Sequence, residues 1–146
     1  MRVSVIGGSR VTDAEYEVAE ELGRTLGERG HDVVCGGLTG VMEAVAAGMA
    51  DTGGRAIGIL PGTDIGQANP NIDIPVATGM GSARNVLVVL NGEAAIAVDG
   101  GTGTLSEIAH ALDMGRPVAG LGTHDIEGVE AVNSPQAAVS YVESSR

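Results

Sequence analysis

Short apolar runs alternate with longer amphipathic segments along the whole chain. A continuous apolar run of about four to eight residues, bounded by glycine or polar turns, is typical of a strand that is buried on both faces of a sheet. On this pattern we predict strands at Arg2 to Ile6, Asp32 to Cys35, Arg55 to Leu60, Ile74 to Ala77, Ala94 to Val98 and Val118 to Leu121.

The segments between these runs have helical character. Gly30, Gly92 and Gly115 stand just past the ends of three of them, where glycine commonly terminates a helix. Thr12 and Glu15 have the spacing of a capping box, in which the side chain of each residue bonds the backbone amide of the other. The predicted helices are Asp13 to Arg29, Thr39 to Asp51, Ala83 to Asn91, Leu105 to Met114 and Pro135 to Ser144.

Strand and helix signals that alternate over 146 residues favour one domain, residues 1–146, of the α/β class. We expect a single Rossmann-like domain with a mainly parallel sheet and helices on both faces. The chain has no Phe or Trp, so the core must be built from smaller apolar side chains. The longest loop, from Leu60 to Asn71, either closes over a ligand as a lid or is a solvated connector.

The segment Asp99 to Glu107 carries the strongest chemical signal. It follows a predicted strand, contains three glycines within four positions, and leads into a predicted helix. Glycines let the backbone approach a ligand closely, and the free amides at the start of a helix favour an anion. Thr102 and Thr104 add hydroxyl donors, and Glu107 lies about one helical turn further on. This arrangement predicts a phosphate cradle with an acid beside it.

Two other strand-to-helix corners are also rich in glycine. In a parallel sheet these corners share the edge formed by the carboxyl ends of the strands, so together they outline one pocket. The residues that we predict to contact a phosphorylated ligand there are Gly7, Gly8, Ser9, Gly36, Gly37, Thr39, Gly100, Gly101, Thr102, Gly103 and Thr104. The alternative for each corner alone is a turn that merely joins a strand to a helix.

The spacing of the main loop differs from familiar nucleotide motifs. It lacks the Gly-Lys-Ser/Thr of a Walker loop, and Ser106 stands where Gly-x-Gly-x-x-Gly needs its last glycine. The combination of Gly-Gly-x-x-Gly-x-Met from Gly36, an arginine at Arg84, and Gly-Gly-x-Gly-Thr-x-x-Glu from Gly100 resembles the Lonely-guy (LOG) family. The run from Gly81 to Val86 is similar to a short microbial branch that is itself similar to the molybdenum-cofactor carrier proteins.

The resemblance implies a dimeric, nucleotide-binding Rossmann-like protein. In LOG enzymes the N-glycosidic bond of a nucleoside 5′-monophosphate is hydrolysed without a cofactor, and their catalytic arginine and glutamate fall on Arg84 and Glu107. The chain departs from that pattern with Asp99 in place of proline and Asn85 in place of lysine. Two functions therefore stay open: phosphoribohydrolase-like hydrolysis, or non-catalytic carriage of a nucleotide or the molybdenum cofactor.

Charge and composition limit the kinds of partner that we expect the chain to bind. The net charge of −11 leaves no basic surface for nucleic acid, and no apolar run reaches the ~20 residues that span a bilayer. One cysteine, Cys35, excludes an internal disulfide, and we expect a cytoplasmic protein. The acidic composition fits a high-salt source or an ordinary acidic protein. The three histidines show no metal-ligand spacing, so no metal site is predicted.

Two further expectations follow from single features. An older label of the LOG family is "possible lysine decarboxylase". The chain has no lysine, so it cannot form the lysine Schiff base of a pyridoxal-phosphate decarboxylase. The predicted helix from Ala83 to Asn91 is apolar on too many sides for one core-facing stripe, which predicts that part of it packs against a second subunit in a homodimer. The alternative is burial within its own domain.

Overall fold

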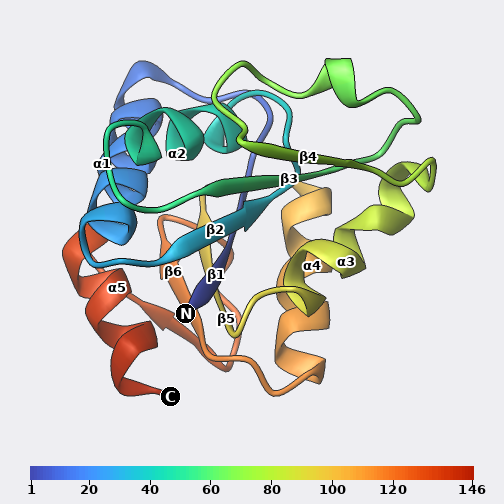
Figure 1. Ribbon diagram of the computed structural model, residues 1–146. Helices are drawn as coiled ribbons and strands as arrows, with labels where there is room; N and C mark the ends of the chain where they lie inside the picture. Colours follow the sequence, from blue (N-terminus) through green and yellow to red (C-terminus); the bar gives the residue numbers. More distant parts are fainter.

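The computed structural model describes residues 1–146, and a parallel sheet runs through its centre (Figure 1). Its strands lie in the order β4-β3-β2-β1-β5-β6-β7, and every neighbouring pair is parallel. The predicted α/β class is confirmed. The strands are β1 (Arg2–Gly7), β2 (Asp32–Cys35), β3 (Ala56–Leu60), β4 (Ile74–Ala77), β5 (Ala94–Val98), β6 (Val118–Leu121) and β7 (Val129–Ala131).

The strand at the β7 edge was not predicted from the sequence. It has only three residues, two of them exposed, so it lacks the continuous apolar run that marks a buried strand. Pairing with β6, in which Val118 lies opposite Val129, is what defines it. The other predicted strands are all present, with bounds that agree to within one residue.

The five α-helices also follow the predicted order. They are α1 (Asp13–Glu28), α2 (Val41–Met49), α3 (Asn85–Leu90), α4 (Thr102–Asp113) and α5 (Pro135–Ser144), with short 3-10 turns η1 (Ile65–Gln67) and η2 (Gly81–Arg84). The predicted helix from Ala83 is split between η2 and α3. The start of α4 was wrong by three residues, because Thr102 to Thr104 carry no apolar periodicity. None of the helices combines the length and apolar character needed to cross a bilayer.

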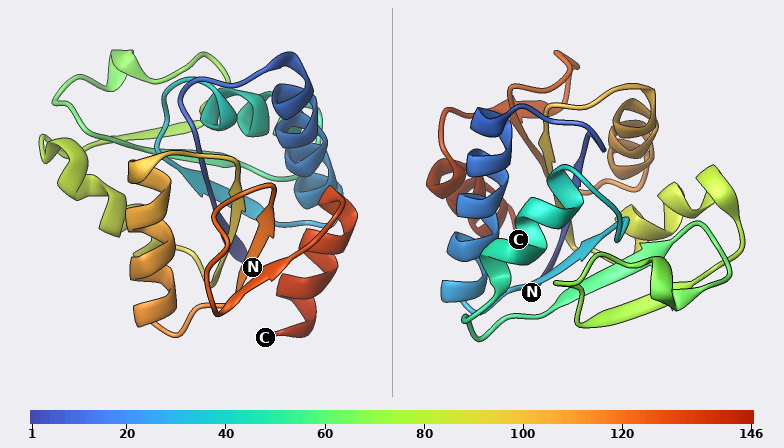
Figure 2. Two further views of the ribbon diagram at one scale, coloured as in Figure 1. Left: turned by 180° about the vertical axis from the view of Figure 1, so that it is seen from behind. Right: turned by 90° about the horizontal axis from the view of Figure 1, so that it is seen from above.

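Helices cover both faces of the sheet, as predicted (Figures 1 and 2). One face packs against α1, α2 and α5 through a cluster of 22 buried apolar residues, and the other packs against α3 and α4 through a cluster of 11. Consecutive strand residues serve opposite clusters: Val5 belongs to the larger and Ile6 to the smaller. Both strand faces are thus apolar, which explains the continuous runs in the sequence.

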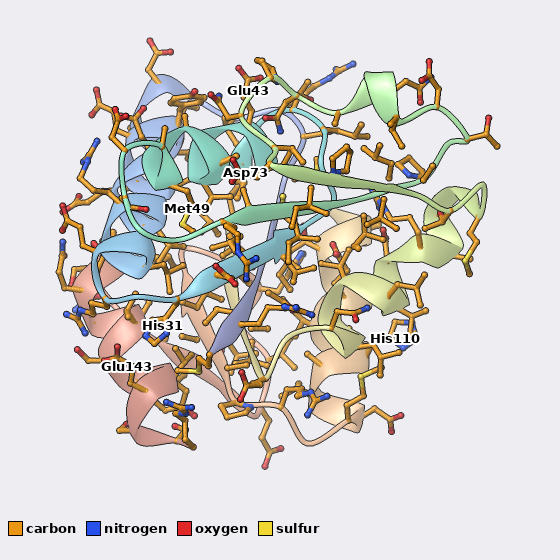
Figure 3. The ribbon with its side chains drawn as sticks, viewed as in Figure 1. His31, Glu43, Met49, Asp73, His110 and Glu143 are labelled. Atoms are coloured by element: carbon orange, nitrogen blue, oxygen red, sulfur yellow. The ribbon has the colours of Figure 1, made fainter.

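Polar contacts anchor α1 and α5. Thr12 caps α1 by accepting a bond from the Glu15 amide at 3.2 Å, and it donates its hydroxyl to the Glu15 carboxylate at 2.9 Å. At the other end, Glu143 on α5 contacts His31 at 2.7 Å (Figure 3). The hydrogen bond from His31 is the main cause that lowers the pKa of Glu143, and Arg29 adds to it.

The strand order reverses beside β1. The chain builds β2, β3 and β4 outward on one side of β1 and then returns to lay β5 against its other side, with Gly7 opposite Val98. Helices that follow strands on either side of such a point diverge, which leaves a crevice at the carboxyl ends of the strands. The fold therefore positions a site between the ends of β1 and β5.

Candidate functional site

A pocket of about 400 Å³ opens at this crevice. Segments that are far apart in the sequence meet there: the end of β1, the loop after β2, the turn η2 and the first turns of α4. The lining residues are Val5, Ile6, Gly7, Gly8, Ser9, Gly36, Leu38, Met42, Ser82, Arg84, Asn85, Gly101, Thr102, Gly103, Thr104 and Glu107.

Most of the residues that the glycine corners predicted do line this pocket. Three of the predicted residues do not. Thr39 donates its hydroxyl to the Ser9 carbonyl at 3.0 Å, which ties two of the glycine corners together. Gly37 and Gly100 have φ angles of +79° and +110°, and both are needed to turn the backbone. Their role is to shape the loops behind the pocket wall.

Six lining residues were not predicted from the sequence, namely Val5, Ile6, Leu38, Met42, Ser82 and Asn85. Leu38 and Met42 belong to the Gly-Gly-x-x-Gly-x-Met motif, so their neighbourhood carried a signal. Asn85 was noted only as a departure from the family pattern. Arg10, which also follows a glycine corner, does not line the pocket. The loop from Leu60 to Asn71, for which a lid was one of two alternatives, does not line it either: Asn69 anchors the end of that loop by donating to the Leu38 carbonyl at 2.8 Å.

The first turn of α4 forms one wall. Gly101 is the N-cap, and its carbonyl accepts the bond from the Leu105 amide at 3.0 Å. The amides of Thr102, Gly103 and Thr104 precede the first helical hydrogen bond, so the helix offers them no acceptor. The earlier start of α4 therefore puts the glycines within the helix end itself, where free donors and the helix dipole favour an anion.

Arg84 is the only positively charged residue in the pocket. Its Nε donates to the Ile59 carbonyl at 2.9 Å, Nη1 to Asn85 Oδ1, and Nη2 to the Gly36 carbonyl at 3.5 Å. A Cβ on Gly36 would lie 2.8 Å from Nη2, so glycine is what admits the guanidinium here. Burial lowers the pKa of Arg84, but an arginine side chain is not deprotonated in proteins, so the guanidinium stays charged.

Asn85 connects Arg84 to the wall formed by α4. Its Oδ1 accepts from the guanidinium, and its Nδ2 donates to Ser106 Oγ at 3.4 Å. Ser106 in turn donates to the Gly103 carbonyl at 2.6 Å. The amide side chain thus carries out a bridging role that a lysine could not, since a lysine has no acceptor.

Glu107 lies in the second turn of α4 and is 8% exposed. Burial raises the pKa of its carboxyl to about 7, and the opposing effect of Arg84 is smaller. Arg84 favours the charged form of the carboxyl, but desolvation outweighs it. Near neutral pH this carboxyl exchanges a proton readily, as a general acid or base requires.

Arg84 and Glu107 line the same pocket although they belong to different elements, η2 and α4. No nitrogen–oxygen pair between the two side chains comes within the 4.0 Å of a salt bridge. The guanidinium and the carboxyl are therefore separate groups that face one cavity, and a ligand can interact with each of them.

Asp99 is not among the residues that line this pocket. It lines a different cavity of about 510 Å³, together with Glu15, Leu121 and Pro135. Its Oδ2 nevertheless lies beside the lining residue Gly8, 3.5 Å from where a Cβ on that glycine would stand, so the negative charge that replaces the family's proline borders the predicted phosphate cradle.

Comparison with known proteins agrees with the fold and the motifs. The profile of the SLOG cluster4 family matches residues 1–146. The chain belongs to the SLOG cluster4 family. An uncharacterised family relative from Archaeoglobus fulgidus is 44% identical over 147 residues, which cover 99% of this chain and 96% of that protein.

Two better-described proteins are more distant. The cytokinin riboside 5′-monophosphate phosphoribohydrolase LOG of Oryza sativa subsp. japonica is 32% identical over 123 residues, or 81% of this chain. The chain spans about half of that rice protein, 49% of its length. The molybdenum cofactor binding protein from Rippkaea orientalis is 32% identical, with a TM-score of 0.91 over 98% of this chain and 95% of that one. The predicted resemblance to LOG and carrier proteins is confirmed.

Proposed function

We propose that the chain binds a nucleoside 5′-monophosphate at the pocket and hydrolyses its N-glycosidic bond. The observation that carries this proposal is the buried carboxyl of Glu107, with a pKa of about 7, in the same cavity as Arg84 and the first-turn amides of α4. A phosphate at those amides would anchor the substrate away from the bond that breaks. We call residues 99–104 the phosphate loop.

In this reaction water attacks the anomeric carbon of the ribose, and the bonding electron pair leaves with the base. Glu107 in its ionised form accepts the proton from the attacking water, or stabilises the positive charge that develops on the sugar. Arg84 orients the substrate and balances the charge on the carboxylate. The products are ribose 5-phosphate and the free base, which gains a proton.

The test is incubation with a panel of nucleoside 5′-monophosphates and chromatography for free base. We expect release from at least one of them, none from the matching unphosphorylated nucleosides, and none with Glu107→Gln, which keeps shape but loses charge. If no base appears while the monophosphates bind, the hydrolase proposal is wrong.

A carrier function is the second proposal. It is supported by the TM-score of 0.91 to a molybdenum cofactor binding protein over nearly all of both chains. The molybdenum cofactor carries a phosphate monoester, a group that the amides of Thr102, Gly103 and Thr104 suit as well as a nucleotide phosphate. In a carrier, the same residues would hold the cargo unchanged, and base release would be absent from both the natural chain and Glu107→Gln.

We further propose that the chain is a homodimer. Leu90 at the end of α3 is 49% exposed, and on the same side an apolar groove is lined by Ile74, Val76 and Leu87. A second copy would bury these side chains and also protect the exposed edge strand β4. Light scattering over a range of salt concentrations tests this proposal, and a monomeric mass throughout would refute it.

A further inference from the structure

Three amides of the phosphate loop have no acceptor within the helix and suit an anion, whereas its own carbonyls and its acidic side chain would repel one. The carboxylate of Asp99 lies beside Gly8, as described above. The Gly101 carbonyl accepts from the Leu105 amide within α4 and has a second, side-chain partner, whereas the Asp99 carbonyl accepts from a side chain. Both of these side chains come from the loop between β6 and β7, which does not line the pocket.

Thr123 and His124 provide these partners. Thr123 Oγ1 donates to the Asp99 carbonyl at 2.7 Å, and His124 Nε2 lies 3.0 Å from the Gly101 carbonyl. A carbonyl only accepts, so Nε2 of His124 carries the hydrogen in this contact. The two side chains line a different cavity, which shares no residue with the pocket.

The backbone of the phosphate loop needs such support. Asp99 has a φ of +51°, in the left-handed region that non-glycine residues adopt rarely and at a cost, and Gly100 follows with +110°. The Asp99 amide is held by the Leu121 carbonyl at 3.1 Å, and its carbonyl is held by Thr123. Without the hydrogen bond from Thr123, the peptide between Asp99 and Gly100 is free to rotate, because Gly100 permits either orientation.

We propose that Thr123 and His124 are positioning residues for phosphate binding, which hold the Asp99 and Gly101 carbonyls away from the anion so that only amides face it. This role rests on the proposed function, since it concerns the same phosphate. The two residues belong to the loop that follows the β6 strand, so the site depends on a segment that does not contact the ligand.

The experiment titrates inorganic phosphate and AMP into the full chain by calorimetry. Thr123→Val and His124→Ala should each weaken binding roughly tenfold, since each removes one hydrogen bond that orients the loop. Thr123→Ser and His124→Gln keep a donor at the same reach and should bind within about twofold of the natural chain. The matched control is Thr52→Val, which removes a hydroxyl bond of 2.6 Å to the Met49 carbonyl at the distant α2–β3 turn.

Rescue by the conservative variants distinguishes positioning from general stability, which thermal unfolding records in parallel. The proposal is overturned if Thr123→Val and His124→Ala bind both probes as the natural chain does, or if the conservative variants are equally weak. If Thr123→Val does not fold, the His124 pair decides alone. A natural chain that binds neither probe would refute the proposed function itself and this role with it.

Discussion

Replacement of Glu107 by glutamine should make the protein more stable at neutral and alkaline pH. The carboxyl is 8% exposed, and burial raises its pKa from the ordinary value of 4.5 to about 7. The folded chain therefore binds this proton more tightly than the unfolded chain. The stability of the natural protein falls as the pH rises from 4.5 through about 7, because folding must keep a buried group that increasingly loses its proton.

The size of the effect follows from the two pKa values. One pH unit between them corresponds to 1.36 kcal/mol, so the interval from 4.5 to about 7 gives about 3 kcal/mol when the group is fully ionised. Glutamine has the same shape and no charge, and it escapes this cost. We expect Glu107→Gln to be more stable than the natural chain by about 1 kcal/mol near pH 5.5 and by about 3 kcal/mol near pH 8.

Urea unfolding at a series of pH values between about 5.5 and 8.5 measures this difference without the added ions of guanidinium. Glu17→Gln is the matched control: it removes the same charge from an exposed position on α1 and corrects for relief of the net charge of −11. A difference between Glu107→Gln and this control that stays constant with pH would refute the reasoning. It would mean that the carboxyl is not desolvated, and the argument for proton transfer at neutral pH would fail with it.

Three further substitutions test the pocket itself. Gly101→Val should abolish phosphate binding without loss of folding, since a Cβ at Gly101 meets no atom within 4 Å; unchanged phosphate titration would make the loop a mere connector. Gly36→Ala should weaken AMP binding roughly tenfold, because its Cβ would lie 2.6 Å from Met42 Sδ and 2.8 Å from Arg84 Nη2 and displace both side chains; equal affinity in calorimetry would show that binding does not depend on where these two side chains lie. Asn85→Ala should weaken AMP binding about threefold to tenfold by releasing Arg84, whereas Asn91→Ala, the control, should bind normally.

The glutamine experiment also bears on why such a carboxyl is kept. A buried, unpaired acid lowers stability at the pH where it would act, and the chain contains many exposed acids that carry no such cost. Residues at catalytic sites commonly lower the stability of a protein while they serve its function. In a carrier that performs no proton transfer, the lower stability would bring no catalytic benefit. The stability difference is expected under either function, so the base-release assay discriminates between the two proposals.

The sequence by itself determined the order of the helices and of six strands along the chain, and the bounds of those strands to within one residue. These properties depend on local patterns: apolar runs for strands buried on both faces, and capping or glycine signals for helices. The glycine corners were also sufficient to predict a pocket at one edge, because parallel strands carry their carboxyl ends to the same side. β7 was missed because a short, exposed edge strand is defined by its partner, and its own residues carry no pattern.

Only the tertiary structure decided which residues face the ligand and in what state. Gly37, Thr39 and Gly100 belong to the same glycine corners as the lining residues, yet they do not line the pocket. The pKa of Glu107 depends on how completely other segments remove water from it, and on Arg84, which a different strand crossover delivers. Such properties arise from contacts between residues that are distant in the chain, and a local pattern of residues contains no record of them.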